Sequence, residues 1–438
     1  MSTIKLSLIG LGTRLILAGV SIVSVIVLAR YLEPQGRGEY FLFQAMVSVL
    51  TVFGDLGLSQ SANVFSGRQS DRVSAVHSVL VRLVFVLWVG LIAVGGGVLF
   101  LFGDRLLPNF PLEWQVIAFA VLPITLYAGF WNSMMVGMGQ IRVLNVVQLV
   151  ISPCQLLLVA VFVVGLSGGV LSAVFIYVAT MVIQGLLMLI LAFRLGLKGN
   201  KQEPLGGLAR QMVSFGLRGY VGSVSTMLWM RVPVFLLNVF HGPVSVGIFS
   251  VAQQLAEKVL LPMQAVQDAI YRKMSTFSGG EATQAMNRYL RVVSSGMVMV
   301  VLVGMLIAPW VVILLFGKSY SGAATVFRVL LIGTAFTGVA MIVSTYLLGQ
   351  RQRPGLLSLL AGVNALVCLL LSFWFIPAWA EVGAASALVL TQLLGTMVVF
   401  VMYLAMSSTP MKDALLLNSK DIAMLVNQIG GLAWWKRA

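Results

Sequence analysis

Four basic residues stand within long apolar stretches of the sequence, where a charged side chain is unexpected: Arg14, Arg218, Arg231 and Lys258. A charge at the depth of the bilayer hydrocarbon costs roughly several kcal/mol, so such residues usually face a water-filled cavity or a partner. Guanidinium and ammonium groups that gather on one cavity wall suit a diphosphate or another anion. The pattern therefore predicts a cationic cavity lined by these four residues.

Three acidic residues, Asp55, Glu257 and Asp268, also fall within apolar stretches. Glu257 and Lys258 are neighbours, so on a helix their side chains diverge by about 100° and do not form a facing pair. Each acid is a candidate either for a proton or sodium site or for the counter-ion of an arginine. The counter-ion interpretation is the simpler of the two.

A second interpretation of the basic residues has to be kept beside the cavity. Arg14 and Arg218 lie near the ends of their stretches, where a long side chain can extend to the lipid headgroups, and the two interpretations are equally good for them. Arg231 and Lys258 lie deeper, which favours the cavity.

Other chemistry finds little support in the sequence. Cys154 and Cys368 lie in apolar runs without the spacing of a disulfide framework or a metal site, and His77 and His241 fall at the edges of such runs. No phosphate-binding loop and no catalytic triad signature is visible. We therefore expect no enzyme activity, no metal and no cofactor other than a coupling proton or sodium ion.

The elements that would position these residues are membrane-spanning helices. Of the 438 residues, 59% are apolar and only 9% charged, against roughly 45–50% and about 25% in soluble domains. Apolar stretches long enough to cross about 30 Å of hydrocarbon recur along the whole chain. They predict an all-α polytopic membrane protein with twelve spans, at 8–30, 40–63, 78–102, 114–137, 143–165, 169–193, 213–239, 244–270, 291–315, 324–348, 356–377 and 382–406.

The net charge of +15 serves mainly to orient the chain, because Lys and Arg are retained on the cytoplasmic side of a membrane. The outer loops would carry only Arg30, Arg37, Arg105 and Lys318, which places both termini in the cytoplasm. We expect a first lobe at 1–200, a cytoplasmic linker at 201–212, a second lobe at 213–406 and a cytoplasmic amphipathic tail at 407–438.

The two halves of the chain resemble each other, which indicates an internal repeat. EPQGRGEYFLFQ at 33–44 matches GPVSVGIFSVAQ at 242–253, and LFGD at 101–104 matches LFGK at 315–318. The first match pairs Pro34 with Pro243, Gly38 with Gly247 and Gln44 with Gln253. Because six spans is an even number, the repeats share one orientation and are related by a pseudo-two-fold axis along the membrane normal. The prediction is two six-helix lobes that face each other across a central space.

At the level of whole motifs, the sequence resembles the polysaccharide transport branch of the multidrug/oligosaccharidyl-lipid/polysaccharide exporter superfamily, the Wzx-type flippases. The resemblance covers nearly the whole chain and is carried by LARYLEPQGRGEYFLF (28–43), SVGIFSVAQQLAEKVLLPMQAV (245–266), LFGKSYSGAATVFRVLLIG (315–333) and the segment 349–387.

The resemblance implies a flippase that moves an undecaprenyl-diphosphate-linked oligosaccharide, such as an O-antigen unit, to the periplasmic leaflet by alternating access, driven by an ion gradient. It also implies lobes in an inverted V around a cationic cavity, a monomer among membrane lipids, and association with glycan polymerase and chain-length machinery but not with nucleic acid. One departure matters: many relatives have an aspartate in the seventh span where this chain has Arg231-Val232-Pro233, so their ion site cannot be transferred.

Three other functions remain open at this point. A drug/cation antiporter of the related multidrug branch would have to accept cations beside a cationic lining. A lipid II flippase is close in fold but resembles a longer chain with two extra helices. A polytopic polysaccharide polymerase or ligase would need a sizeable outer loop, and the outer loops here are short.

Overall fold

The structure, a computed structural model, describes residues 3–68, 73–108, 110–195, 205–274, 280–349, 354–407 and 410–415. Within these ranges the protein is helical and contains no strand. Its helices are α1 (Thr3–Asp55), α2 (Leu58–Arg68), α3 (Val73–Leu91), η2 (Ile92–Gly96), α4 (Gly97–Leu106), α5 (Leu112–Gly137), α6 (Ile141–Val159), η3 (Ala160–Gly165), α7 (Gly169–Arg194), α8 (Leu205–Val259), α9 (Leu261–Met274), α10 (Gly280–Phe316), η4 (Lys318–Tyr320), α11 (Ser321–Gly349), α12 (Pro354–Ser407) and α13 (Met411–Leu415).

In the described part of the chain, nine helical segments are long and apolar enough to cross a membrane. Three of the long helices contain a break with non-helical backbone angles: α1 at Glu33, α8 at Gly242 and α12 at Ala380. Dividing these three at their breaks gives the twelve spans that the sequence predicts. The predicted fold class, an all-α multi-pass membrane protein, is therefore confirmed.

Two of the three breaks directly precede a proline, and this changes the expected connections. Pro34 follows Glu33 and Pro243 follows Gly242, and a proline disfavours the helical conformation of the residue before it. Glu33 has φ 55°, a left-handed conformation that costs a non-glycine residue about 1–3 kcal/mol, whereas Gly242 adopts φ 78° without a side chain to clash. Where loops were expected, at 31–39 and 240–243, the chain reverses almost within one residue.

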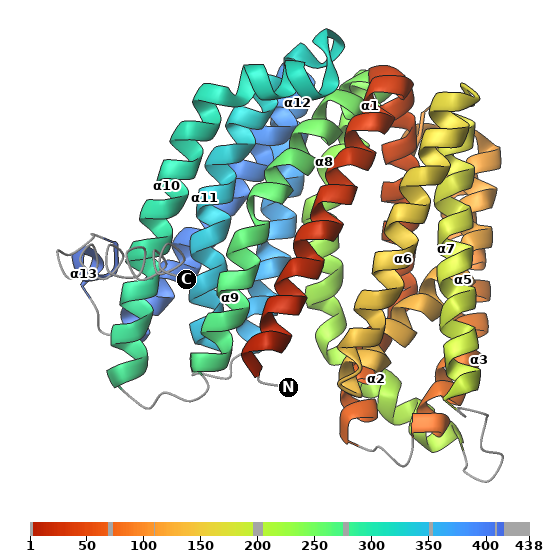
Figure 1. Cartoon of the computed structure of the whole chain (residues 1–438), viewed down its shortest axis with the longest axis horizontal. Helices are drawn as coiled ribbons and strands as arrows, with labels where there is room; N and C mark the ends of the chain where they lie inside the picture. Colours follow the sequence, from red (N-terminus) through yellow and green to blue (C-terminus); the bar gives the residue numbers. More distant parts are fainter. Residues whose placement is uncertain are drawn as a thin grey trace, which may run out of the picture.

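The helices form two groups with α1 and α8 between them (Figure 1). One group contains α3, α5, α6 and α7 and the other α10, α11 and α12, as the predicted lobes require. We call the end of the bundle with the three breaks the kink end. The end where α1 begins and α12 finishes is called the terminal end.

The core differs between these two ends. One buried cluster combines residues from both halves of the sequence at the kink end, among them Leu32, Leu107, Val246 and Phe316. Two other clusters lie toward the terminal end, and each belongs largely to one lobe: the first includes Leu58 and Met134, the second Tyr346 and Tyr403. The lobes thus share a core at the kink end and have separate cores at the terminal end.

Two predicted segments can be compared only in part. The described chain already enters α8 at Leu205, inside the segment 201–212 that was expected to be a linker. Of the expected tail at 407–438, α13 is described, and the amphipathic pattern beyond Leu415 lies outside the described residues.

Candidate functional site

Arg231 lies at the interface between the lobes. It is half-buried on α8, and its guanidinium carbon is 5.5 Å from the centroid of the Phe41 ring on α1. It interacts electrostatically with Tyr177 of α7 and with Glu257 further along α8, and its Nε is buried without a hydrogen-bond partner. A cation in this setting has donor capacity left for a ligand between the lobes.

Glu257 and Lys258 occupy the last turn of α8, close to Arg231 in space. The Lys258 Nζ donates a hydrogen bond to the Ser21 Oγ of α1 at 2.9 Å, and the Gln253 Nε2 donates to the Glu257 Oε1 at 3.1 Å. The Glu257 side chain is exposed, and the charges of Arg231 and Lys258 act on its carboxylate. The structure therefore brings Arg231, Glu257 and Lys258 together.

A helix break beside these residues explains how they reach the interface. α8 ends at Val259, and α9 begins at Leu261 with Pro262 in its first turn. A proline has no N–H, so the carbonyl of Lys258 cannot receive the usual hydrogen bond from four residues later. The break thus removes the regular helical donor of the Lys258 carbonyl at the point where Glu257 and Lys258 lie.

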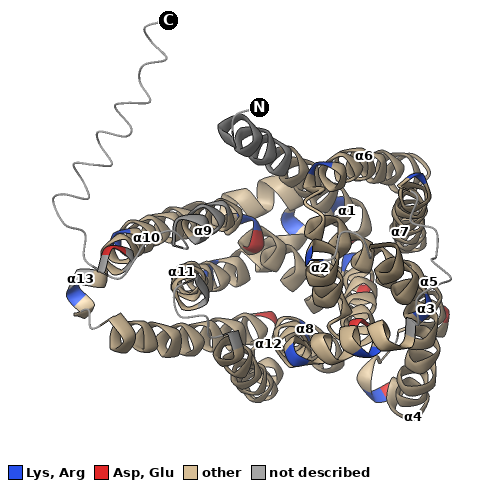
Figure 2. Cartoon of the chain, turned by 90° about the horizontal axis from the view of Figure 1, so that it is seen from below, with Lys and Arg blue, Asp and Glu red and all other residues tan. Residues whose placement is uncertain are grey.

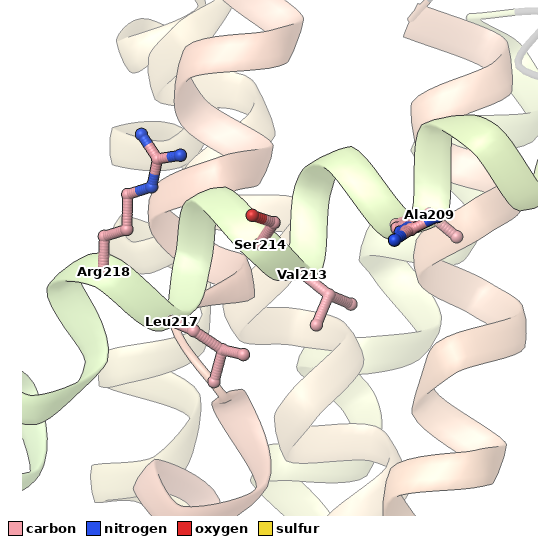
Figure 3. Close-up of a pocket in the computed structure, with 6 residues that line it drawn as sticks. Ala209, Val213, Ser214, Leu217 and Arg218 are labelled. Carbon is pink, nitrogen blue, oxygen red and sulfur yellow. The ribbon is translucent and has the colours of Figure 1, made fainter.

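The other predicted cations are not part of this cluster as far as it is described. Arg218 is exposed on α8 and lines an open hollow of about 600 Å³ with Arg210, Ser214 and Leu217. Its guanidinium extends to the side of the helix opposite Leu217 and Val213 (Figure 3). Thirteen residues separate Arg218 from Arg231, about 140° around a helix axis at 100° per residue, so the two do not share a face.

Two predicted residues lie where only the backbone is described. Arg14 belongs to α1 and Asp268 to α9, and their side chains are outside the described part of the structure. Their predicted roles stay predictions.

Asp55 has a local task in the structure. It ends α1, and its Oδ1 accepts hydrogen bonds from the backbone N–H of Ser59, at 3.1 Å, and from the Ser59 hydroxyl, which caps the start of α2. The carboxylate also interacts electrostatically with Tyr220 of α8. Capping accounts for an acid at this position without an arginine partner or a bound ion.

Ribbon segments coloured for charge lie on the helices in the middle of the bundle as well as at its rim (Figure 2). Among the residues that the structure describes, no group of three or more His, Cys, Asp or Glu side chains is placed to hold a metal ion.

The pseudo-symmetric kink end forms a close contact between the lobes, which we call the clasp. A side chain at Gly38 would overlap the Pro243 carbonyl, and one at Gly247 would overlap the Pro34 carbonyl. The internal repeat relates Pro34 to Pro243 and Gly38 to Gly247, so the two contacts are equivalent under the pseudo-two-fold axis. Around them, the Arg30 Nε donates to the Leu315 carbonyl at 2.7 Å and the Tyr320 hydroxyl to the Ala29 carbonyl at 3.0 Å.

Sequence reasoning missed one residue of the clasp. Arg37 was expected in an outer loop, yet it lies inside α1 with only 1% of its surface exposed. Its burial could have been inferred from its position, because Arg37 lies between Pro34 and Gly38, two residues that the repeat matches to residues of the second lobe.

These features define a multi-pass membrane protein of two pseudo-symmetric lobes with charged residues between them, and comparisons with known proteins agree. Residues 4–265 match the family described as polysaccharide biosynthesis protein. The chain belongs to this family, which confirms the resemblance found in the sequence. No match is found among curated proteins.

Solved structures show the same fold in transporters of the MOP superfamily. The chain is similar to the lipid II flippase MurJ in an inward closed conformation, with a TM-score of 0.69 and 12% identity over 92% of this chain and 88% of that one. An inward-facing multidrug resistance MATE transporter gives 0.68 and 16% over 89% and 94%. A MOP superfamily transporter from Pyrococcus furiosus, described as having a binding pocket of reverse polarity, gives 0.62 and 17% over 92% and 94%.

Proposed function

We propose that this protein is a flippase that carries a lipid-linked oligosaccharide with a diphosphate headgroup between the leaflets of the bacterial inner membrane. The observation that carries the proposal is the cluster of Arg231, Lys258 and Glu257 between the lobes. Guanidinium and ammonium donors bind phosphate oxygens through charge-assisted hydrogen bonds, and a cavity inside a membrane protein strengthens them. Membership of the polysaccharide biosynthesis family supports a glycan as the cargo.

The charge pattern of the loops supports an orientation of the protein in the membrane, and with it a direction of transport. With both termini in the cytoplasm, the terminal end, where the lobes have separate cores, faces the cytoplasm and the kink end faces the periplasm. The lipid headgroup would enter between the lobes from the cytoplasmic leaflet. It would be released once the clasp parts and the terminal end closes, which is alternating access.

The energy source belongs to the same proposal. Glu257 shares the site with both cations, so a proton or sodium ion bound to it would change the net charge that the diphosphate meets. An imposed proton or sodium gradient should accelerate transport by the parent protein. It should have no effect on Glu257→Gln if this carboxylate is the coupling group.

Leaflet-selective transport is the experiment that tests the proposal. The full chain is reconstituted into vesicles with a fluorescent undecaprenyl-diphosphate-linked oligosaccharide, and the fraction accessible to an impermeant quencher is followed with time. We expect translocation that falls at least tenfold in Arg231→Gln, because one charge-assisted hydrogen bond of about 1.5–3 kcal/mol is lost. Arg105→Gln, an exposed cation on α4, is the control and should transport normally.

A drug/cation antiporter is the second candidate, and the specific observation that favours it is the carboxylate of Glu257 in the lobe interface together with the MATE-like fold. Efflux of a small organic cation, with no translocation of any diphosphate-linked lipid, would support this alternative and overturn the flippase proposal.

A further inference from the structure

Arg37 is the most buried cation in the described part of the molecule. It lies in α1, three residues after Pro34, and only 1% of its surface is exposed. Its Nε has no hydrogen-bond partner. Burying a charge whose donors are not all paired costs roughly several kcal/mol, so an apolar side chain would be more stable at this position if Arg37 served only for packing.

The groups that the structure describes as acting on Arg37 come from both lobes. Its guanidinium carbon lies 5.6 Å from the centroid of the Tyr40 ring. The groups that act electrostatically on it, among the residues that the structure describes, are the hydroxyls of Tyr40 and of Tyr320, not a carboxylate. Because Tyr320 belongs to η4 of the second lobe, the guanidinium lies at the lobe interface.

A row of aromatic rings connects Arg37 with the central site. Tyr40 packs edge to face on Tyr177 with ring centroids 6.3 Å apart, and Tyr177 interacts electrostatically with Arg231. The next residue of α1, Phe41, carries Arg231 over its own ring. Tyr40 and Phe41 are consecutive residues of α1. Tyr40 contacts Arg37 near the kink end, and Phe41 contacts Arg231 at the central site.

The clasp covers Arg37 in this conformation. Gly38, the next residue, contacts the Pro243 carbonyl of the second lobe, and Tyr320 is held to α1 by its hydrogen bond to Ala29. If the lobes separate at the kink end, Tyr320 leaves with the second lobe. The guanidinium then loses its cover and faces the opening.

We propose that Arg37 is a second anion-binding site, hidden while the clasp is closed, which takes over the diphosphate headgroup from Arg231 and Lys258 when the kink end opens. The inference rests on the proposed function. It adds a release site to the central site, and the buried charge of Arg37 favours clasp opening because opening rehydrates it.

Binding of a soluble probe, geranyl diphosphate, to the full chain in nanodiscs tests the inference in two backgrounds. In the parent protein the clasp is closed. In Gly247→Ala the added methyl group overlaps the Pro34 carbonyl and so keeps the clasp open. We expect Arg37→Gln to weaken binding about tenfold in the Gly247→Ala background and less than twofold in the parent. Arg105→Gln should change neither. Unchanged affinity on Arg37→Gln in both backgrounds overturns the inference.

A second measurement keeps the test decisive if Gly247→Ala does not fold. Arg30→Gln removes hydrogen bonds to the Leu314 and Leu315 carbonyls and loosens the clasp from its exposed rim. With Cys154→Ala removing the exposed native thiol, Arg37→Cys should react with an impermeant maleimide several times faster in the Arg30→Gln background than without it. Equal rates would also overturn the inference.

Failure of the proposed function would look different. In that case the parent protein would not bind geranyl diphosphate and Arg231→Gln would change nothing, whatever happens at Arg37. If Arg231→Gln weakens binding in the parent and Arg37→Gln is silent in both backgrounds, the flippase proposal stands and the second site does not.

Discussion

The kink end and the terminal end of the bundle are built on different principles. At the kink end one buried cluster includes residues of both lobes, and backbones approach each other through Gly38 and Gly247. At the terminal end each lobe has its own cluster, and exposed polar groups such as Gln60 and Ser223 make contacts across the lobes. Both ends therefore contain a backbone contact that has no room for a side chain, since Gly57 and Gly216 also meet at the terminal end, but only the kink end adds a large core that both lobes share.

The largest effect is expected for the clasp. Gly247→Ala places a methyl group in the space of the Pro34 carbonyl, and overpacking of this kind costs about 1–3 kcal/mol if the closed state is kept. We expect a lower melting temperature in detergent, and faster labelling of cysteines introduced at the kink end by an impermeant reagent.

The matched control for the clasp is Gly19→Ala on α1, because a side chain at Gly19 meets nothing within 4 Å. A Gly247→Ala protein with the stability and labelling of Gly19→Ala would show that the kink end is not a tight contact, and the comparison between the two ends would fail.

The second effect concerns the site between the two ends. Lys258→Met keeps the length of the side chain but loses its charge and its hydrogen bond to Ser21. We expect translocation of the diphosphate-linked lipid to fall about tenfold. Ser21→Ala removes the same hydrogen bond and leaves the charge, so its translocation should stay within about threefold of the parent. Equal losses would mean that Lys258 acts by holding the lobes together rather than by its charge.

The fold and part of the site could be predicted from the sequence, for identifiable reasons. Apolar length fixes the spans, and the repeat that pairs Pro34 with Pro243 indicates two lobes. The depth of Arg231 and Lys258 within their spans pointed to the interface where the structure brings them together with Glu257. The position of Arg218 nearer a helix end left its direction open, and the structure shows it exposed.

What could not be predicted depends on tertiary contacts. The break at Glu33 extends α1 through a segment that reads as a polar loop, and this extension buries Arg37. In the sequence, Asp55 looks like an acid inside a membrane span. It can cap α2 only because α1 ends at this residue and Leu56 and Gly57 then adopt positive φ angles. Neither fact is contained in the hydrophobic pattern.

A smaller effect is expected for Asp55, near the terminal end. Asp55→Ala removes the cap of α2 and should lower the free energy of unfolding by about 1 kcal/mol. Asp55→Asn retains an oxygen acceptor and should be nearly as stable as the parent. Chemical denaturation measures the first effect, and vesicle transport of Asp55→Asn decides the role of the charge. Normal transport supports a cap, whereas loss of transport in a stable protein would make Asp55 an ion-coupling group.

The smallest effect is expected for the polar contact of the terminal end. The Gln60 Nε2 donates a hydrogen bond of 3.2 Å to the Ser223 Oγ across the lobes, and the pair is exposed. A hydrogen bond in contact with water exchanges one partner for another, so Ser223→Ala should change the free energy of unfolding by no more than about 0.5 kcal/mol and transport by less than twofold. If the two ends differ as described, Ser223→Ala has this small effect while Gly247→Ala has a large one. If Ser223→Ala opened the terminal end as far as Gly247→Ala opens the kink end, the two ends would be equally easy to open. The lobes would then not be joined more tightly at the kink end than at the terminal end.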